Sequence, residues 1–233
     1  MSKPVCTVVG VGPGNGAACA RRFAAAGYAT ALLARSADYT SELASELPGS
    51  RAYACDVTSG AEIASAFAAI REDLGDVEHL IYNAGSGAFG SIDDTEAADF
   101  EEAWRINALG GFLAAKEVIP TMQAAGHGSI VFTGATASLR GGANFTAFAA
   151  AKAAQRSLAQ SMARHLGPSG IHVCLVIVDG VIDLPRTREF LPDRPDSLFL
   201  QPADIAETTF LLTQQNPSAW TFEIDLRPAA EKW

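Results

Sequence analysis

An apolar run that breaks into a cluster of glycines is the feature near the start of the chain that most limits how it can fold. Residues 5–9 read Val-Cys-Thr-Val-Val, and glycines at positions 10, 12, 14 and 16 lead into an alanine-rich stretch with helical spacing. This order predicts a strand, a tight turn and a helix. Glycine lets a ligand approach the main chain, and the unpaired amides that begin a helix favour a pyrophosphate.

The spacing of these glycines indicates what the turn binds. Gly10, Gly14 and Gly16 follow Gly-x-x-x-Gly-x-Gly. The related pattern Gly-x-Gly-x-x-Gly begins at Gly10 and Gly12, but Asn15 stands at its third glycine. An ordinary strand-to-helix turn is the alternative interpretation. Because the cluster opens a βαβ unit, we predict a nucleotide site that includes Asn15.

Strands and helices alternate along the rest of the chain. Apolar runs predict further strands over residues 28–34, 51–55, 77–82, 129–133, 171–178 and 220–226. Helical patterns occupy 16–26, 38–47, 61–74, 99–123, 145–166 and 202–214. Six alternations without a linker or repeat predict one α/β domain over residues 1–233. We expect a three-layer αβα Rossmann fold with a doubly wound, mostly parallel seven-stranded sheet.

Composition excludes several classes of partner. The net charge of −9 argues against nucleic acid and anionic membranes, and no apolar segment is long enough to span a bilayer. The start of the chain shows no signal peptide, so we expect a cytoplasmic protein. The histidines do not cluster with cysteines or carboxylates, so no metal is expected. The scattered cysteines lie in or beside apolar runs, which indicates buried, reduced thiols at positions 6, 19, 55 and 174.

Residues at the carboxyl ends of the next two strands indicate how adenosine would be held. Arg35 follows the strand at 28–34, where a carboxylate would accept the ribose hydroxyls of NAD. A cation there suits the 2′-phosphate of NADP, although a solvated loop arginine is the alternative. Asp56 and Val57 close the strand at 51–55. Asp56 can accept from the adenine amino group while Val57 packs on the ring, or Asp56 can simply start a turn.

Two asparagines and a long loop complete the candidate site. Asn83-Ala84-Gly85 follows a strand, where small residues allow close approach and Asn can brace neighbouring strands. Asn107 lies within the helix predicted at 99–123, and Gly110-Gly111 could weaken that helix locally. The polar loop 134–144 carries Thr136, Ser138 and Arg140. Residues 179–201 lack periodicity, which is typical of a substrate lid.

Taken together, these motifs make the sequence similar to the short-chain dehydrogenase/reductase family over nearly its whole length. The matching pieces lie in the same order on the same elements: Gly10, Gly14, Gly16, Asp56-Val57, Asn83-Ala84-Gly85, Asn107 and Lys152. The resemblance implies that Asp56 and Val57 bind adenine and that residues 83–85 line the cofactor. It also implies that Lys152 holds the nicotinamide ribose, with Gly180 and Ile182 near the cofactor. A homo-dimer or homo-tetramer through the helices carrying Asn107 and Lys152 is expected.

The sequence departs from the family pattern where the proton is transferred. The family's catalytic tyrosine lies four residues before the lysine, and here that residue is Phe148. Its serine lies thirteen residues before the tyrosine, and here that residue is Ala135. Leu184 stands where a threonine usually holds the carboxamide. The nucleotide-binding half therefore matches the family, and the proton-transfer half does not.

Three accounts of this altered site remain open. A displaced donor could act with Lys152 and Asn107, and its candidates are Thr133, Thr136, Ser138 and Thr146. The substrate could instead be an activated C=C or C=N bond that takes its proton from solvent. The third account is an NADP(H)-binding protein without turnover, such as a sensor or partner subunit. We predict an oxidoreductase that acts on a small molecule and prefers NADP(H) to NAD(H). Arg140 could pair with an acidic substrate or be an ordinary surface cation.

Overall fold

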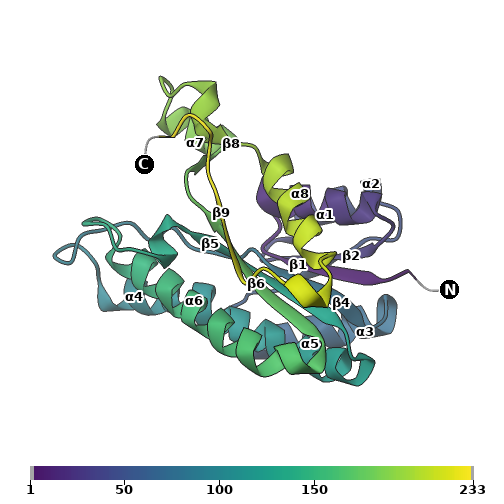
Figure 1. Cartoon of the computed structure of the whole chain (residues 1–233). Coiled ribbons are helices and arrows are strands. Elements are labelled where there is room, and N and C mark those ends of the chain that lie inside the picture. The colour runs from purple at the N-terminus through teal and green to yellow at the C-terminus, as the bar shows by residue number, and fades with distance from the viewer. Residues whose placement is uncertain (1–2, 232–233) are drawn as a thin grey trace.

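A parallel sheet of seven strands forms the centre of the computed structural model, which describes residues 3–231 (Figure 1). The strand order is β3-β2-β1-β4-β5-β6-β9, and each neighbouring pair is parallel. The strands are β1 Val5–Val9, β2 Ala29–Ala34, β3 Arg51–Ala54, β4 Val77–Tyr82, β5 Gly128–Ala135, β6 Ile171–Val178 and β9 Glu223–Leu226. The order reverses between β1 and β4, so the first glycine turn lies at the switch point where such sheets bind ligands. The predicted Rossmann fold is confirmed.

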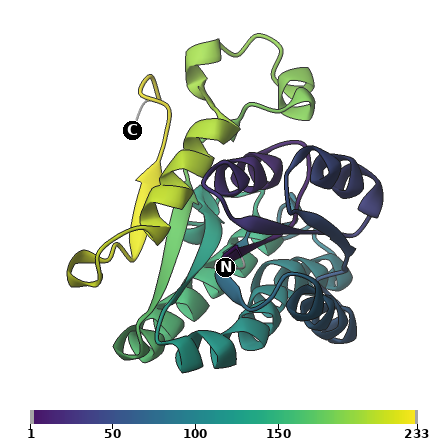
Figure 2. The ribbon, with the colours of Figure 1, turned by 90° about the vertical axis from the view of Figure 1, so that its right-hand side faces the viewer.

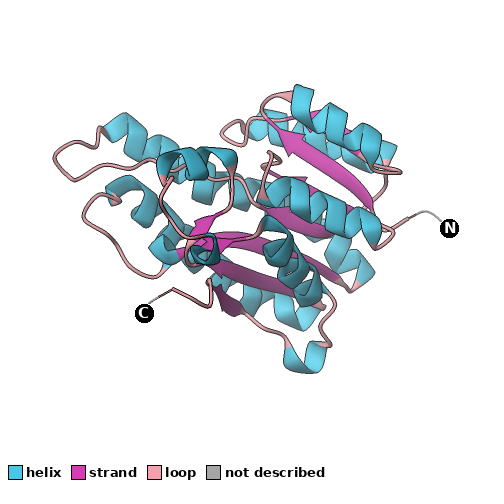
Figure 3. Cartoon of the chain, turned by 90° about the horizontal axis from the view of Figure 1, so that it is seen from above, coloured by secondary structure: helices cyan, strands magenta, loops and turns pink. Residues whose placement is uncertain are grey.

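Helices cover both faces of this sheet (Figures 1 and 2). One face carries α1 Asn15–Ala25, α2 Ala37–Glu46 and α8 Pro202–Thr213. The other face carries α3 Gly60–Asp73, α4 Ala97–Trp104, α5 Gly110–Ala125 and α6 Thr146–Leu166. Seen from above, the strands lie side by side between the helices (Figure 3). Each helical layer closes over its own apolar core, since β4, β5 and β6 turn alternate side chains to opposite faces.

Glycines near the start of the chain allow unusually close approach of backbone segments. Gly10 has a φ of +87°, and a Cβ atom there would lie 2.4 Å from the Ala84 backbone nitrogen. A Cβ atom on Gly16 would lie 2.6 Å from the Gly10 carbonyl oxygen. No side chain larger than hydrogen fits at either position, so these glycines are required by the fold itself.

The long helix predicted at 99–123 is divided into three parts. α4 and α5 are joined by a π-helical turn over Arg105–Leu109, which contains Asn107. The helix is irregular directly before Gly110, where the π-helical turn ends, and the two glycines also have close neighbours. A Cβ atom on Gly110 would lie 2.4 Å from the Tyr82 hydroxyl, and one on Gly111 would lie 2.8 Å from the Phe132 ring. These glycines let the helix pack closely on the sheet.

Residues 179–201 contain more regular structure than the missing periodicity indicated. β7 Val181–Ile182 pairs with β8 Phe199–Leu200 in parallel, and α7 Pro185–Phe190 lies between them. A two-residue strand and a six-residue helix are too short to show a period in the sequence. In Figure 1 this segment stands above the layers, beyond the end of β6. Smaller differences are a longer β5, which runs to Ala135, and a shorter β9, which begins at Glu223.

Candidate functional site

The turn between β1 and α1 presents backbone donors at the start of a helix. The amides of Asn15 and Gly16 have no backbone partner among the described residues. The Asn15 Oδ1 atom is buried and has no hydrogen-bond partner there either. A Cβ atom on Gly12 would meet nothing within 4 Å, so the turn is open at that point. The two amides and the open glycine fit a phosphate-bearing nucleotide, because phosphate oxygens can accept from the helix amides. The Asn15 Oδ1 atom would instead need a donor.

Asn83 ties this turn to the neighbouring strand. Its Nδ2 atom donates to the Gly10 carbonyl oxygen at 2.8 Å, and its amide donates to Val9 at 2.9 Å. The predicted bracing of strands by Asn83 is confirmed. The contact of Gly10 with Ala84 explains why a small residue follows Asn83. The two loops are thus held as one surface at the carboxyl ends of β1 and β4.

Leu184 lies over the same turn. A Cβ atom on Gly14 would be 2.5 Å from Leu184 Cδ2, so the leucine side chain packs directly against the glycine. Thr187 fixes the start of α7 by accepting from the Leu184 amide at 3.0 Å. The segment that follows β6 therefore touches the turn between β1 and α1 with an apolar side chain. Gly180 and Ile182 lie at the base of the same segment, and Ile182 pairs with Leu200.

The predicted adenosine contacts gather at the ends of β2 and β3. Arg35 is exposed, and its charge helps to lower the pKa of Asp56. The larger cause is Thr58, whose amide and hydroxyl both donate to Asp56 Oδ1 at 2.8 Å. Asp56 therefore does start a turn, and Val57 is buried beside it. The two charges interact, so the Asp56 carboxylate lowers the positive electrostatic potential around Arg35.

Lys152 is buried on α6 beneath the carboxyl end of β5. Its Nζ donates to the Thr133 carbonyl oxygen at 2.7 Å and to Gln155 Oε1 at 3.2 Å. Burial lowers the pKa of Lys152 to about 7. Asn107 lies nearby, because a Cβ atom on Gly85 would be 3.2 Å from Asn107 Oδ1 and 3.6 Å from the lysine Nζ. The structure thus brings the predicted Asn107, Lys152 and Gly85 together.

One turn before Lys152, Phe148 belongs to a cluster of three aromatic rings. Its ring centroid lies 5.8 Å from Phe89 and 6.4 Å from Phe145, and Phe89 lies 5.3 Å from Phe145. The loop after β4 is joined to the start of α6 by backbone hydrogen bonds, from Gly90 to Asn144 and from Thr146 to Gly90. Phe89 nevertheless exposes 68% of its surface. Three apolar, partly exposed rings therefore lie where the family pattern would place the phenol of a tyrosine.

The candidate hydroxyl donors near this aromatic cluster differ in burial and in whether they already make a hydrogen bond. Ser138 is buried, and its oxygen accepts from the Ala135 amide at 3.1 Å. Thr136 donates to Asp179, a residue that also pairs with Arg227 at 3.2 Å. Thr133 and Thr146 are partly exposed. Ser138 thus supports the backbone, and Thr136 is held by a carboxylate.

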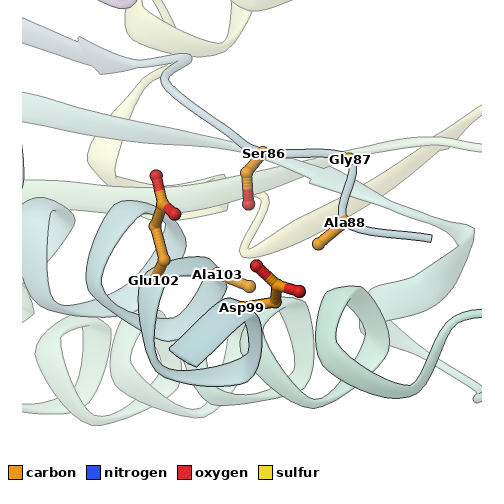
Figure 4. A pocket seen from close by; sticks show the side chains of 6 residues that line it. All are labelled: Ser86, Gly87, Ala88, Asp99, Glu102 and Ala103. Atoms are coloured by element: carbon orange, nitrogen blue, oxygen red, sulfur yellow. The ribbon is translucent and has the colours of Figure 1, made fainter. Parts of the chain in front are cut away.

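A pocket of about 210 Å³ opens between the loop after β4 and α4. Ser86, Asp99 and Glu102 point toward a common space there (Figure 4). Asn107 Nδ2 donates to Ser86 Oγ at 3.3 Å, so the pocket adjoins the buried asparagine. Its two carboxylates disfavour anionic groups at this opening. Arg140 is exposed in a separate hollow, beside Leu139 and Phe145.

The sheet order and the glycine turn at its switch point define the class of the protein as a Rossmann-fold protein. A family model described as short chain dehydrogenase matches residues 4–194. An inactive 2-(S)-hydroxypropyl-CoM dehydrogenase of Xanthobacter autotrophicus is 33% identical over 83% of this chain and 90% of its own length. A solved short-chain dehydrogenase from Rhodopseudomonas palustris is 34% identical, with a TM-score of 0.83 over 97% of this chain and 98% of its own. A metagenomic short-chain oxidoreductase in complex with NADP is 26% identical, with a TM-score of 0.84 over 98% of this chain and 99% of its own.

The chain therefore belongs to the short-chain dehydrogenase family, as its motifs predicted. The described residues contain no helix with the length and apolar character needed to cross a membrane. The four cysteines are buried and free, as predicted.

Sequence reasoning missed three parts of the site. Phe89 lies in a loop with no periodic pattern, and only the structure shows that it meets Phe148. Asp99 and Glu102 look like a solvated helix face, although their spacing of three residues does place them on one side of α4. Gln155 lies three residues after Lys152 and is fully buried. The available signal in the sequence was its spacing from Lys152, which places the two side chains on the same side of a helix.

Proposed function

We propose that this chain is an NADP(H)-binding oxidoreductase that reduces an activated C=C or C=N bond. The observation that carries this proposal is the apolar cluster around Phe148, one turn from Lys152. Phenylalanine has no proton to give, and Ala135 offers no side-chain donor. A C=C bond conjugated to an electron-withdrawing group, or an iminium, can accept hydride and take any required proton from water. The bound dinucleotide would supply that hydride.

The residues that would hold the dinucleotide come from loops at one edge of the sheet, from the start of α1 and from α6. We propose that the α1 amides at Asn15 and Gly16 hold the pyrophosphate, with close approach at Gly10 and Gly14. Asp56 and Val57 would contact adenine, and Lys152 would donate to the nicotinamide ribose. The remaining contacts would be Asn83, Ala84, Gly85, Gly180 and Ile182. Each lies at the carboxyl end of a strand or just beyond it.

NADP(H) is the cofactor that the charge pattern favours. Arg35 is exposed at the end of β2 and forms no ion pair among the described residues, so its guanidinium can meet a 2′-phosphate. The nearby Asp56 carboxylate has Oδ1 occupied by Thr58. The similar metagenomic oxidoreductase was solved with NADP, which supports the same choice.

The surroundings of the site favour an apolar small-molecule substrate. Phe89 and Phe145 line the approach to Phe148, and both are exposed. We propose that residues 179–201 form the lid of this site, within one domain that spans residues 1–233. In this proposal the protein is cytoplasmic and assembles as a homo-dimer or homo-tetramer through the helices that carry Asn107 and Lys152.

A second candidate function is binding of NADP(H) without turnover. It is favoured by the relative from Xanthobacter autotrophicus that is named as an inactive dehydrogenase. In that case the glycine turn and Lys152 would bind the dinucleotide, and the aromatic cluster would serve a partner or regulatory ligand.

NADPH consumption separates these functions. We would measure NADPH absorbance with a panel of enones and cyclic imines, and use the matched saturated ketones as controls. The proposal predicts turnover of the enones or imines and little turnover of the ketones. Tight NADPH binding without any turnover would support the second candidate. Equal reduction of the saturated ketones would show that another residue donates the proton.

A further inference from the structure

Gln155 has a buried side-chain amide whose oxygen and nitrogen each form a hydrogen bond with a candidate site residue. It lies on α6, three residues after Lys152, and is fully buried. Its Nε2 donates to the Asn107 carbonyl oxygen at 2.9 Å, and its Oε1 accepts from Lys152 Nζ at 3.2 Å. A buried amide is costly unless its hydrogen bonds are made, and this one makes a bond at each end.

The Asn107 carbonyl oxygen, which accepts from Gln155 Nε2, lies in the π-helical turn Arg105–Leu109. The regular pattern of the helix is interrupted there, which is common at functional sites. The Asn107 side chain faces other groups, because its Nδ2 donates to the Ala103 carbonyl oxygen at 2.9 Å and to Ser86 at 3.3 Å. Gln155 thus connects the main chain of the π-helical turn to the lysine.

Every group that the structure places against Lys152 Nζ is neutral. These groups are the Thr133 carbonyl on β5, the Gln155 amide on α6 and the loop after β4 near Gly85. Asn107, from the π-helical turn, contributes a neutral amide nearby. Among the described residues no carboxylate pairs with the ammonium, so the two oxygens that accept from it are what stabilise its charge.

We propose that Gln155 is a positioning residue that holds the Lys152 ammonium in place for the cofactor ribose. The inference rests on the proposed binding of NADP(H) at this site. The carboxamide oxygen accepts from Nζ while the amide nitrogen is anchored on Asn107, so the lysine head cannot swing away from β5. A carboxamide fixes a hydrogen bond but does not readily pass a proton on. Lys152 is therefore built to bind rather than to be reprotonated through α6.

The test uses the titration of Lys152 itself and requires no cofactor. The sequence holds only four lysines, so lysine labelled with ¹³C at Cε gives few NMR signals, and Lys152→Met assigns one of them. In the wild type we expect this signal to titrate near pH 7, because burial lowers the pKa of Lys152 to about 7. Gln155→Met removes an acceptor, so the ammonium loses support and the titration moves to lower pH. Gln155→Glu adds a negative charge, so the titration moves to higher pH.

NADPH affinity is measured on the same proteins from pH 5.5 to 9. Because the protonated lysine is the better donor, wild-type affinity should fall as pH rises through about 7. At pH 7, Gln155→Met should bind NADPH about tenfold more weakly, as expected for a lost hydrogen bond to a charged group. The fall in affinity should occur at lower pH in Gln155→Met and at higher pH in Gln155→Glu. Gln160→Met, on the same helix, is the matched control, because no described hydrogen bond involves the Gln160 side chain.

The outcomes separate this inference from the proposed function. A Lys152 titration that does not move in either variant overturns the positioning role, as does an equal loss of NADPH affinity at every pH. A titration that moves as expected in a protein that binds no NADPH upholds the Gln155–Lys152 coupling and overturns the proposed cofactor. Far-UV circular dichroism checks that each variant is folded, and Gln155→Met tests the inference alone if Gln155→Glu does not fold.

Discussion

The two ends of the candidate site are built in different ways. At the cofactor end, backbone meets backbone: a Cβ atom on Gly16 would lie 2.6 Å from the Gly10 carbonyl oxygen. At the substrate end, the Phe148 ring meets other side chains at centroid distances of 5.8 and 6.4 Å. The first kind of contact forces the identity of the residue, and the second does not. The substrate end can therefore vary in a chain of this family while the glycine turn stays the same.

Substitution of Gly16 should have the largest effect. A valine there would press against the Gly10 carbonyl and the Val11 backbone, which cannot move aside like a flexible side chain. We expect Gly16→Val to lose about 3 kcal/mol or more of the free energy of unfolding, measured by urea denaturation. Gly12→Ala is the control, since a Cβ atom at Gly12 meets nothing within 4 Å. If Gly16→Val were as stable as Gly12→Ala, the close approach at the cofactor end would not be a constraint.

Restoring the missing groups at the substrate end should change activity without harming the fold. Phe148→Tyr alone should add little carbonyl reduction, because Ala135 still leaves the substrate oxygen without a side-chain donor. Phe148→Tyr combined with Ala135→Ser should gain more than the product of the single variants, up to about 10²-fold, since one such donor contributes about 10²–10³ in rate. Steady-state NADPH oxidation with reactive diketones and quinones measures this. A wild type that already matches the double variant would show that Phe148 is no guide to the chemistry.

Substitution of Arg35, at the cofactor end of the site, should have a smaller effect, on cofactor affinity. Arg35→Ala should weaken NADPH binding about tenfold and leave NADH binding nearly unchanged, because only NADPH carries the 2′-phosphate. Fluorescence titration of both cofactors gives the ratio. Lowering the salt concentration should enlarge the difference, because the arginine is exposed and its charge is screened. Equal weakening of both cofactors would place the arginine elsewhere along the dinucleotide.

Much of the fold followed from local rules in the sequence. The alternation of apolar runs with helical patterns, and the glycines at positions 10, 14 and 16, predicted the sheet and its first turn. Local rules did not show where close packing requires a particular residue. Gly110 reads as a helix breaker, but close contact with Tyr82 makes glycine the residue that fits. The short elements in residues 179–201 leave no periodic trace, and the pairing of Val181 with Phe199 joins residues far apart in the chain.

The candidate site was predictable where a residue type is tied to a turn or a strand end. Asn83 is an example, because an amide that follows a strand can reach the neighbouring one. The aromatic cluster was not predictable, since Phe89 and Phe148 meet only after two loops are joined by hydrogen bonds at Gly90. The link from Gln155 to Asn107 depends on a π-helical turn that no sequence pattern indicated.

The contact between Leu184 and Gly14 bears on how any measured affinity should be interpreted. The leucine packs against the turn that we propose for the pyrophosphate. If it blocks this turn, the dinucleotide would bind only to those molecules in which the leucine has moved away. An apparent dissociation constant is then the intrinsic constant divided by the fraction of molecules in that conformation. Arg188 pairs with Asp183 at 2.6 Å on this segment, so it would contribute to that fraction. A substitution there would tighten or weaken cofactor binding without touching a single cofactor contact.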